Sequence, residues 1–208
     1  MKTRSLAALA LLAAAPAFAQ TVTLDFEGAA GYVNGIGQFY NGGTDQAGQS
    51  GPNYGVSFTG GAVALSNDPA FDPYYADAPS PLTVMFAFDG DTFMNVASGF
   101  GGTLAFAYSA LASSVVNVYS GLNGTGSVLG SASLSANALA GCASAPSCNF
   151  DFTSVQFAGV ARSVGFGDNP GSVLYDNVTI TPVPEPSAYL LMALGLAAVG
   201  VVKRRRAA

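Results

Sequence analysis

The sequence predicts an all-β fold, an antiparallel β-sandwich of jelly-roll type, followed by one C-terminal transmembrane helix. Most of the chain consists of short runs in which apolar and polar residues alternate with period two, the pattern of half-buried strands. Turn-forming Gly, Asn, Pro and Ser separate these runs, and the body shows almost no helical periodicity. Many short antiparallel strands without long helices are typical of sandwiches and jelly rolls.

Residues 1–19 are predicted to be a secretory signal peptide. A basic start precedes an apolar run at residues 6–15 that is too short to span a membrane, and Ala17 and Ala19 fit the small-x-small cleavage pattern. We therefore expect the Sec machinery to export the chain and signal peptidase to cut it before Gln20. The body then folds in an oxidising compartment.

Residues 20–181 are predicted to form one β-sandwich domain, because about 160 residues suit a single core. Asn123 and Gly124 are a hairpin turn signal between two of the alternating runs. The run at residues 55–65 is weaker, because Gly60 and Gly61 interrupt it. Strands are expected at residues 21–27, 55–65, 82–88, 103–109, 114–120, 127–134, 150–157, 161–166 and 172–180.

The charge of this body limits its function. It holds eleven acidic residues and one basic residue, Arg162, a net charge of −10 that the whole-chain value of −5 conceals. Such a surface repels nucleic acid and attracts divalent cations. The sequence has no histidine, which excludes Ser-His-Asp and Cys-His catalysis and histidine metal sites. We expect no enzymatic activity; a polysaccharide-active enzyme with two carboxylates is the alternative.

The two cysteines, Cys142 and Cys148, are expected to form a disulfide. An even cysteine count in an exported chain favours this pairing over a metal site or a catalytic thiol. The loop between them is short, so the bond should stabilise the fold by about 2 kcal/mol.

Asp176 is the acid whose position most needs an explanation. It shares strand parity with the apolar residues Leu174 and Val178, and an acid on an apolar face needs a partner. Many carbohydrate-binding jelly rolls are similar here: they pair an acid on the first strand with an Asp near the end of the last strand. That resemblance implies Glu27 and Asp176 as ligands of a structural Ca²⁺. The alternative is that Asp176 caps a turn or pairs with Arg162.

Tyr74 and Tyr75 are the candidate ligand-binding residues. They lie in the Pro- and Asp-rich segment 66–81, and loops on a rigid scaffold commonly carry binding groups. Their rings would stack on a sugar. The alternative use of these rings is packing that anchors the loop.

The tail, residues 182–208, has three parts in a fixed order. Prolines hold a short motif extended and outside any sheet ladder. The apolar run at residues 187–202 is about 24 Å long as a helix, against a hydrocarbon core of about 30 Å, so it is a marginal anchor. The basic end stays on the cytoplasmic side. The motif is Pro184, Glu185 and Pro186, and the basic end is Lys203, Arg204, Arg205 and Arg206.

This three-part tail resembles the PEP-CTERM sorting signal of Gram-negative bacteria. The resemblance implies that an exosortase recognises the Pro-Glu-Pro motif and processes the chain near it. The protein would then pass from the inner membrane, held by the C-terminal helix, to the cell surface or extracellular matrix. Such tails are associated with exopolysaccharide and biofilm. We expect an exported, non-enzymatic surface or matrix protein; the alternatives are a calcium-stabilised carbohydrate-binding module and a plain tail anchor.

Overall fold

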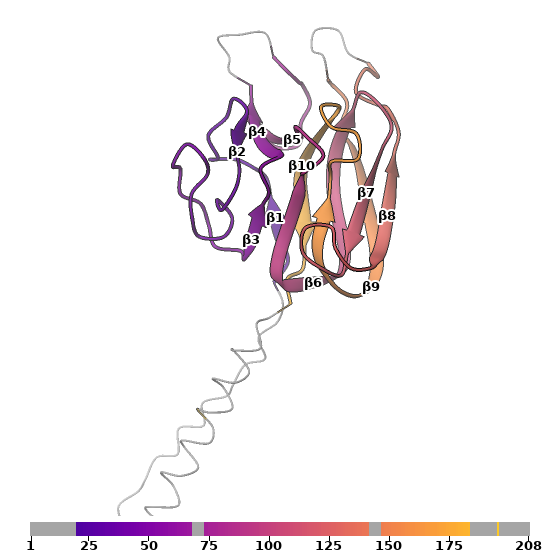
Figure 1. The fold of residues 1–208 in the computed structure, drawn as a ribbon. Coiled ribbons are helices and arrows are strands. Elements are labelled where there is room, and N and C mark those ends of the chain that lie inside the picture. Colours follow the sequence, from indigo (N-terminus) through magenta and orange to yellow (C-terminus); the bar gives the residue numbers. More distant parts are fainter. Residues whose placement is uncertain (1–19, 68–72, 142–146, 184–194, 196–208) are drawn as a thin grey trace, which may run out of the picture. The chain divides into compact units, whose positions relative to one another are not determined.

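The body is built from ten antiparallel strands (Figure 1). The computed structural model describes residues 20–67, 73–141, 147–183 and Gly195. Residues 20–183 fall in one compact unit. The strands are β1 Val22–Leu24, β2 Asn34–Gly35, β3 Val56–Phe58, β4 Ala62–Ser66, β5 Thr83–Ala87, β6 Phe93–Ala110, β7 Ser114–Tyr119, β8 Val128–Leu134, β9 Asp151–Gly165 and β10 Val173–Ile180.

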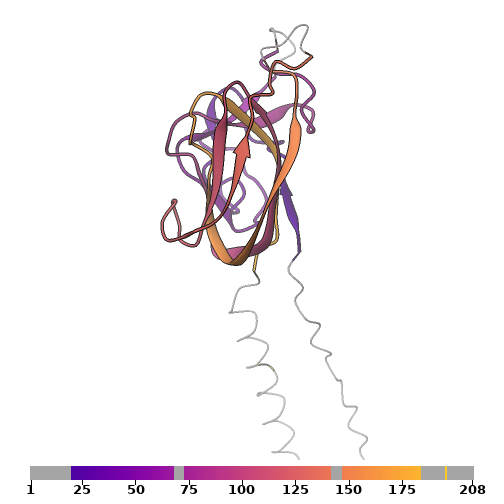
Figure 2. The ribbon, with the colours of Figure 1, turned by 90° about the vertical axis from the view of Figure 1, so that its right-hand side faces the viewer.

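Two long strands, β6 and β9, join the parts of the sheet. The strand order is β2-β4-β5-β10-β6-β9-β7-β8, with β1 added to β10 and β3 added to β6. The start of β6 pairs with β3 and the end of β9, whereas its second half pairs with β10 and the start of β9. The sheet thereby folds over into two layers (Figures 1 and 2). The all-β antiparallel prediction is confirmed, and the arrangement is sandwich-like.

Glycines mark the place where β6 passes from one layer to the other. The register of β6 against β9 shifts between Asn95 and Phe100 and again between Gly101 and Thr103. Gly99 has φ +86°, and a Cβ there would lie 2.3 Å from a methyl group of Val160. A bulge with glycine in the left-handed region is the usual way for a strand to bend sharply.

These bends correct two sequence-based boundaries. The strand expected at residues 103–109 is only the second half of β6, which begins at Phe93. The strands expected at residues 150–157 and 161–166 are one strand, β9. In both cases glycines were interpreted as loop signals although they bend a continuous strand. The Asn123-Gly124 hairpin is present, with β7 and β8 paired on either side of the turn.

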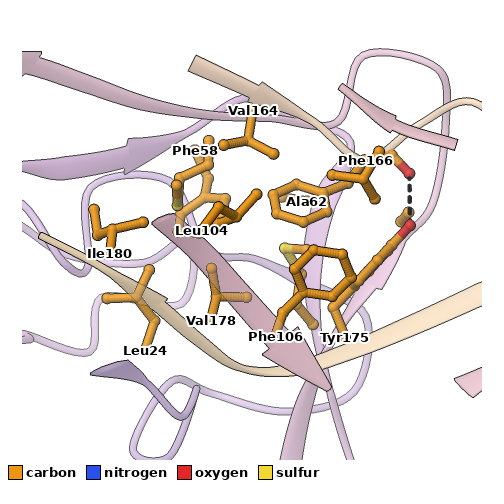
Figure 3. Packing of buried hydrophobic residues seen from close by; sticks show 14 of the residues in the cluster. Leu24, Phe58, Ala62, Leu104, Phe106, Val164, Phe166, Tyr175, Val178 and Ile180 are labelled. Atoms are coloured by element: carbon orange, nitrogen blue, oxygen red, sulfur yellow. Dashed lines mark hydrogen bonds between the residues drawn. The ribbon is translucent and has the colours of Figure 1, made fainter. Parts of the chain in front are cut away.

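Three aromatic rings meet in the main core, which the two layers enclose (Figure 3). Phe166 lies 4.7 Å from Tyr175, and Phe106 lies 5.7 Å from Tyr175, between ring centroids. All three rings are almost fully buried. The Tyr175 hydroxyl donates a hydrogen bond of 3.2 Å to the carbonyl of Phe166, which satisfies its polar atom.

A second apolar cluster lies on the opposite face of β4, β5 and β10. It consists of Leu65, Tyr75, Val84 and Leu174. Val84 belongs to this cluster whereas its neighbour Met85 belongs to the main core, as strand alternation requires. These three strands are therefore covered on both faces.

The expected C-terminal helix, residues 187–202, lies outside the described residues apart from Gly195. Among the residues that the structure describes, no helix is both long and apolar enough to cross a membrane.

The packing predicts opposite costs for two Phe→Ala substitutions. Phe106 is 1% exposed in the main core, so Phe106→Ala should lower the free energy of unfolding by about 3 to 5 kcal/mol. Phe152, on β9, is 72% exposed, and Phe152→Ala should cost less than about 1 kcal/mol. Urea unfolding of both variants measures the difference. Equal costs would contradict the burial described for these two rings.

Candidate functional site

A β-bulge in β10 decides where Asp176 points. The pairing of β10 with β6 shifts register between Asp176 and Thr179, and Asn177 has φ +49°. As a result Val178 packs in the main core, whereas Leu174 belongs to the second cluster. The predicted common face for Leu174, Asp176 and Val178 is therefore wrong beyond the bulge. Asp176 lies on the Leu174 face and is fully buried.

The buried carboxylate of Asp176 accepts three hydrogen bonds. Its Oδ2 accepts from the backbone N–H of Ser80 at 2.7 Å. Its Oδ1 accepts from the Ser80 hydroxyl at 3.0 Å and from the N–H of Asn177 at 2.7 Å. Among the described residues, its partners are thus Ser80 and Asn177 rather than Arg162. The carboxylate closes the bulge and fixes the 73–83 loop, defined here as residues 73–83, onto β10.

The hydroxyl of Ser80 is surrounded by acceptors. Besides Asp176, the carbonyl oxygens of Asp25 and Thr83 lie 3.0 and 3.1 Å from its Oγ. A hydroxyl has one proton to donate, so it cannot satisfy all three acceptors at once. Oxygen atoms of Asp25, Thr83 and Asp176 therefore meet around one hydroxyl group.

Glu27 holds the same loop from the other side. Its Oε1 accepts the backbone N–H groups of Leu82 and Thr83, both at 2.9 Å. Glu27 follows β1 and Asp176 lies on β10, and β1 pairs with β10. The structure thus brings together, around residues 80–83, the two acids predicted as calcium ligands.

Burial raises the pKa of Asp176 to about 6. The bonds from Ser80 and Asn177 favour the charged form and lower the pKa, but they offset the loss of solvation only in part. The negative charge of Glu27 raises the pKa further. Either a proton or a nearby cation would offset the cost of burying the charge of Asp176.

The oxygen chemistry of this centre suits calcium, which takes carboxylate and carbonyl ligands. Each carboxylate, however, already accepts backbone N–H bonds on at least one of its oxygens. Among the described residues, no group of three or more His, Cys, Asp or Glu side chains is placed to hold a metal ion. A calcium ion would therefore have to use backbone carbonyls beside Glu27 and Asp176.

The two candidate sugar-binding tyrosines lie in different surroundings. Tyr75 is 1% exposed and donates its hydroxyl to the carbonyls of Leu65 and Leu82, so its ring anchors the loop and is closed to a ligand. Tyr74 is 38% exposed and meets Tyr32 edge to face, with ring centroids 6.3 Å apart. A hydrogen bond with Tyr32 raises the pKa of the Tyr74 hydroxyl.

Asn67 and Ser80 are the residues of this site that the sequence reasoning missed. The amide of Asn67 accepts from the N–H of Tyr74 at 3.0 Å and donates to the carbonyl of Tyr75 at 2.7 Å. The prolines of the loop provide few backbone donors, so polar side chains must attach it. A short polar residue at each end of a Pro-rich segment was the available signal.

Most other predicted site residues lie outside the described part of the chain. Cys148 is disulfide-bonded, and the sequence holds one other cysteine, Cys142, which is outside that part. Val183, next to the Pro-Glu-Pro motif, donates its N–H to the carbonyl of Gly99 at 2.8 Å. Also outside are Ala17, Ala19, Pro184, Glu185, Pro186, Lys203, Arg204, Arg205 and Arg206.

The raised pKa of Asp176 predicts a pH-dependent stability. Because the folded pKa of about 6 exceeds the usual value of 3.8, the folded protein binds this proton more tightly than the unfolded chain. The stabilisation of the folded protein by proton binding at Asp176 is fully present below about pH 4 and is lost as the pH rises through about 6. Its loss lowers the free energy of unfolding by at most about 3 kcal/mol. Urea unfolding between about pH 4 and about pH 7 should show this fall in the free energy of unfolding.

Asp176→Asn should remove the fall, whereas Asp91→Asn, at an exposed carboxyl, should keep it. The same fall in the Asp176→Asn variant would mean that Asp176 is not its source.

Comparisons with known proteins concern the fold and the tail separately. No curated protein matches the chain. A β-1,3-glucan-binding CBM6 from Bacillus halodurans is similar with a TM-score of 0.38 at 9% identity, over 61% of this chain and 89% of that one. A glycoside hydrolase family 43 arabinoxylan arabinofuranohydrolase from Bacillus subtilis, in complex with cellotetraose, is similar with 0.39 at 12% identity, over 67% of this chain and 31% of that one. Likenesses this distant carry no argument about function.

The tail gives a definite match. The family model described as the PEP-CTERM protein-sorting motif matches residues 182–206. The match spans the Pro-Glu-Pro motif, the apolar run and the basic end that the sequence analysis singled out. It implies export and membrane-associated sorting by an exosortase. Residues 182–206 of this chain are therefore a PEP-CTERM protein-sorting motif.

Proposed function

We propose that this protein is a non-enzymatic component of the cell surface or extracellular matrix, delivered there by exosortase processing. The observation that carries the proposal is the sorting motif at residues 182–206. A signal peptide at residues 1–19 would start the route, and a temporary stay in the inner membrane would precede processing. Association with exopolysaccharide in a biofilm is the role proposed for the body after release.

Two properties of the body support a role without catalysis. The sequence has no histidine and the body has no lysine, so common nucleophile activation and Schiff-base chemistry lack their residues. The acids that the fold brings together, Glu27 and Asp176, accept backbone N–H bonds and hold a loop. Their contacts account for them as structural groups.

The body also suits a place outside the cytoplasm. Its single basic residue and many Gly, Ser, Asn and Thr side chains give an acidic, polar surface. Cys148 is disulfide-bonded, and disulfides persist in oxidising compartments. These features support the proposed location without defining a ligand.

The sorting proposal predicts a processing defect. Replacing Pro184, Glu185 and Pro186 by alanine removes the motif but leaves the apolar run and basic end intact. The variant should accumulate as unprocessed precursor in the inner membrane. The wild-type chain should lose its tail and reach the surface or the medium. Intact mass and cell fractionation from the native host measure both.

The control for this experiment changes the body instead. Phe152→Ala, at an exposed position of β9, should be processed like the wild type. Normal processing of the triple-alanine variant would sink the proposal. A wild-type mass that retains residues 203–206 in the inner membrane would point to a plain tail anchor.

A calcium-stabilised carbohydrate-binding module is the second candidate. The observation that favours it is the meeting of Glu27 and Asp176 around Ser80, whose hydroxyl has three acceptors within 3.1 Å. A divalent cation beside these oxygen atoms would offset the cost of burying the Asp176 charge, which raises the pKa of that carboxyl. It would also tie β1, β10 and the 73–83 loop together.

This candidate predicts that calcium stabilises the folded chain. At a calcium concentration a hundredfold above its Kd, the free energy of unfolding should rise by about 2.7 kcal/mol relative to EDTA. Glu27→Gln should abolish the increase and exposed Asp91→Asn should preserve it, as measured by thermal unfolding with and without CaCl₂. The same midpoint in calcium and in EDTA would rule the site out.

A further inference from the structure

A groove crosses the outer surface where β3 pairs with the start of β6. Val56 and Phe58 of β3 point into the main core, so Ser57 faces outward, and its cross-strand neighbour is Asn95. Ala97, two residues along β6, is exposed on the same side. The groove has a volume of about 310 Å³. Small side chains form its floor.

One wall of the groove is the loop between β2 and β3. Gln38 and Asn41 line it, and the Asn41 Nδ2 donates to the Gln38 Oε1 at 2.8 Å. The backbone of Asn41 bridges to that of Asn53. The two amides are thus held in place before any ligand arrives.

The other wall is the tip of the β7–β8 hairpin, residues 121–126. Asn95 and Asn123 exchange two bonds: Asn95 Nδ2 donates to Asn123 Oδ1 at 2.7 Å, and the Asn123 N–H donates to Asn95 Oδ1 at 2.8 Å. The buried Ser163 hydroxyl donates to the Gly121 carbonyl and accepts the Gly124 N–H. This wall is equally rigid, because it is fixed at three points.

These bonds leave several polar groups available to a ligand. Among the described residues, Gln38 Nε2 and Asn123 Nδ2 are donors without a protein partner, and Asn41 Oδ1 is such an acceptor. The Ser57 hydroxyl offers both functions. Leu122, 38% exposed, adds an apolar contact to the lining. Neutral donors and acceptors beside a small apolar surface match the hydroxyls and C–H faces of a sugar.

The groove is free of charge on a strongly acidic body. Its lining contains no Asp, Glu, Lys or Arg, although the body holds eleven acidic residues. An anionic polymer would meet the surrounding negative field without a cation to offset it, and a cation would find no carboxylate in the groove. A neutral ligand fits both facts.

A neighbouring hollow of about 350 Å³ extends the groove. It shares Gln38 and Phe58 with the first, so the two adjoin along β3. Its one carboxylate, that of Asp45, is buried and accepts the N–H groups of Ala30 and Gln49 at 2.7 and 2.8 Å. The two adjoining hollows leave room for more than one unit of a chain.

A polypeptide is a poorer match for this space. Peptides commonly bind beside β-strands by adding to a free edge. The edge of β3 that does not pair with β6 is already occupied, because the N–H of Val56 donates to the Tyr40 carbonyl at 3.3 Å and the N–H of Phe58 to the Gly37 carbonyl at 2.8 Å. Recognition here must use side chains, which favours a polysaccharide.

We propose that this groove binds a segment of a neutral polysaccharide, with Gln38, Asn41 and Asn123 as the hydrogen-bonding residues. The proposal deepens the matrix role proposed above by giving it a ligand class and a site, and it rests on that role for the glycans that surround the protein. It also places the sugar contact on β3 and β6 rather than at Tyr74.

Native gel electrophoresis through neutral polysaccharides tests the proposal. The full chain is held in a detergent without a sugar head group and run through gels that contain dextran, laminarin or galactomannan. Gels with anionic alginate or with gelatin, an unfolded polypeptide, are the comparison. At least one neutral polysaccharide should retard the wild-type chain, and alginate and gelatin should not.

A pair of matched variants locates the site. Ala97→Glu places a charge and a larger side chain on the groove floor. It should raise the apparent Kd for the polysaccharide at least tenfold and so reduce the retardation. Thr103→Glu makes the same charge change at an exposed position of the same strand, away from the groove, and should bind like the wild type. Urea unfolding checks that both variants fold.

Two outcomes overturn the proposal. One is a wild-type chain that no neutral polysaccharide retards, or that alginate or gelatin retards more strongly. The other is equal retardation of the two glutamate variants, which would put the binding elsewhere. The gel assay does not involve sorting, so its failure leaves the processing result intact, and a processing failure leaves the gel result intact.

Discussion

The burial of one carboxylate, that of Asp176, is the constraint on which one side of the body depends. A charge in a protein interior is costly unless hydrogen bonds replace its water. Here Ser80 and Asn177 provide those bonds, and in doing so they fix both the bulge in β10 and the loop that covers it. Without that loop the Leu65 and Leu174 side chains of the second cluster would face solvent.

Glu27 and Tyr75 complete the attachment of this loop. The carboxylate of Glu27 fixes its end, and the Tyr75 ring fills the apolar surface below it. β4, β5 and β10 are therefore covered on both faces. Such two-sided burial is usual for parallel sheets, whereas these strands pair antiparallel. The loop takes the place that a helix would have in an α/β fold.

The sequence predicted the class of fold because strand alternation and turn residues act locally. The resemblance to carbohydrate-binding jelly rolls implied that Glu27 and Asp176 form a pair of calcium ligands; the structure places both acids on residues 80–83, and their role as calcium ligands stays a prediction. The sequence did not predict the face of Asp176, because one bulge residue, Asn177, reverses the alternation, and no local pattern distinguishes a bulge from an ordinary strand residue. The groove was missed for another reason: Gln38, Asn95 and Asn123 come from three distant segments and meet only through long-range pairing.

The position of β10 has a mechanical consequence for a protein handled by its C-terminal end. One edge of β10 pairs first with β5 and then with β1, and its other edge pairs with β6. A pull along the chain beyond Ile180 therefore loads these ladders in shear, so that many hydrogen bonds must break together rather than one after another. The Val183 bond to the bend at Gly99 adds a further hold. The body should therefore resist force applied at its C-terminal end, the end that leads into the sorting motif at residues 182–206.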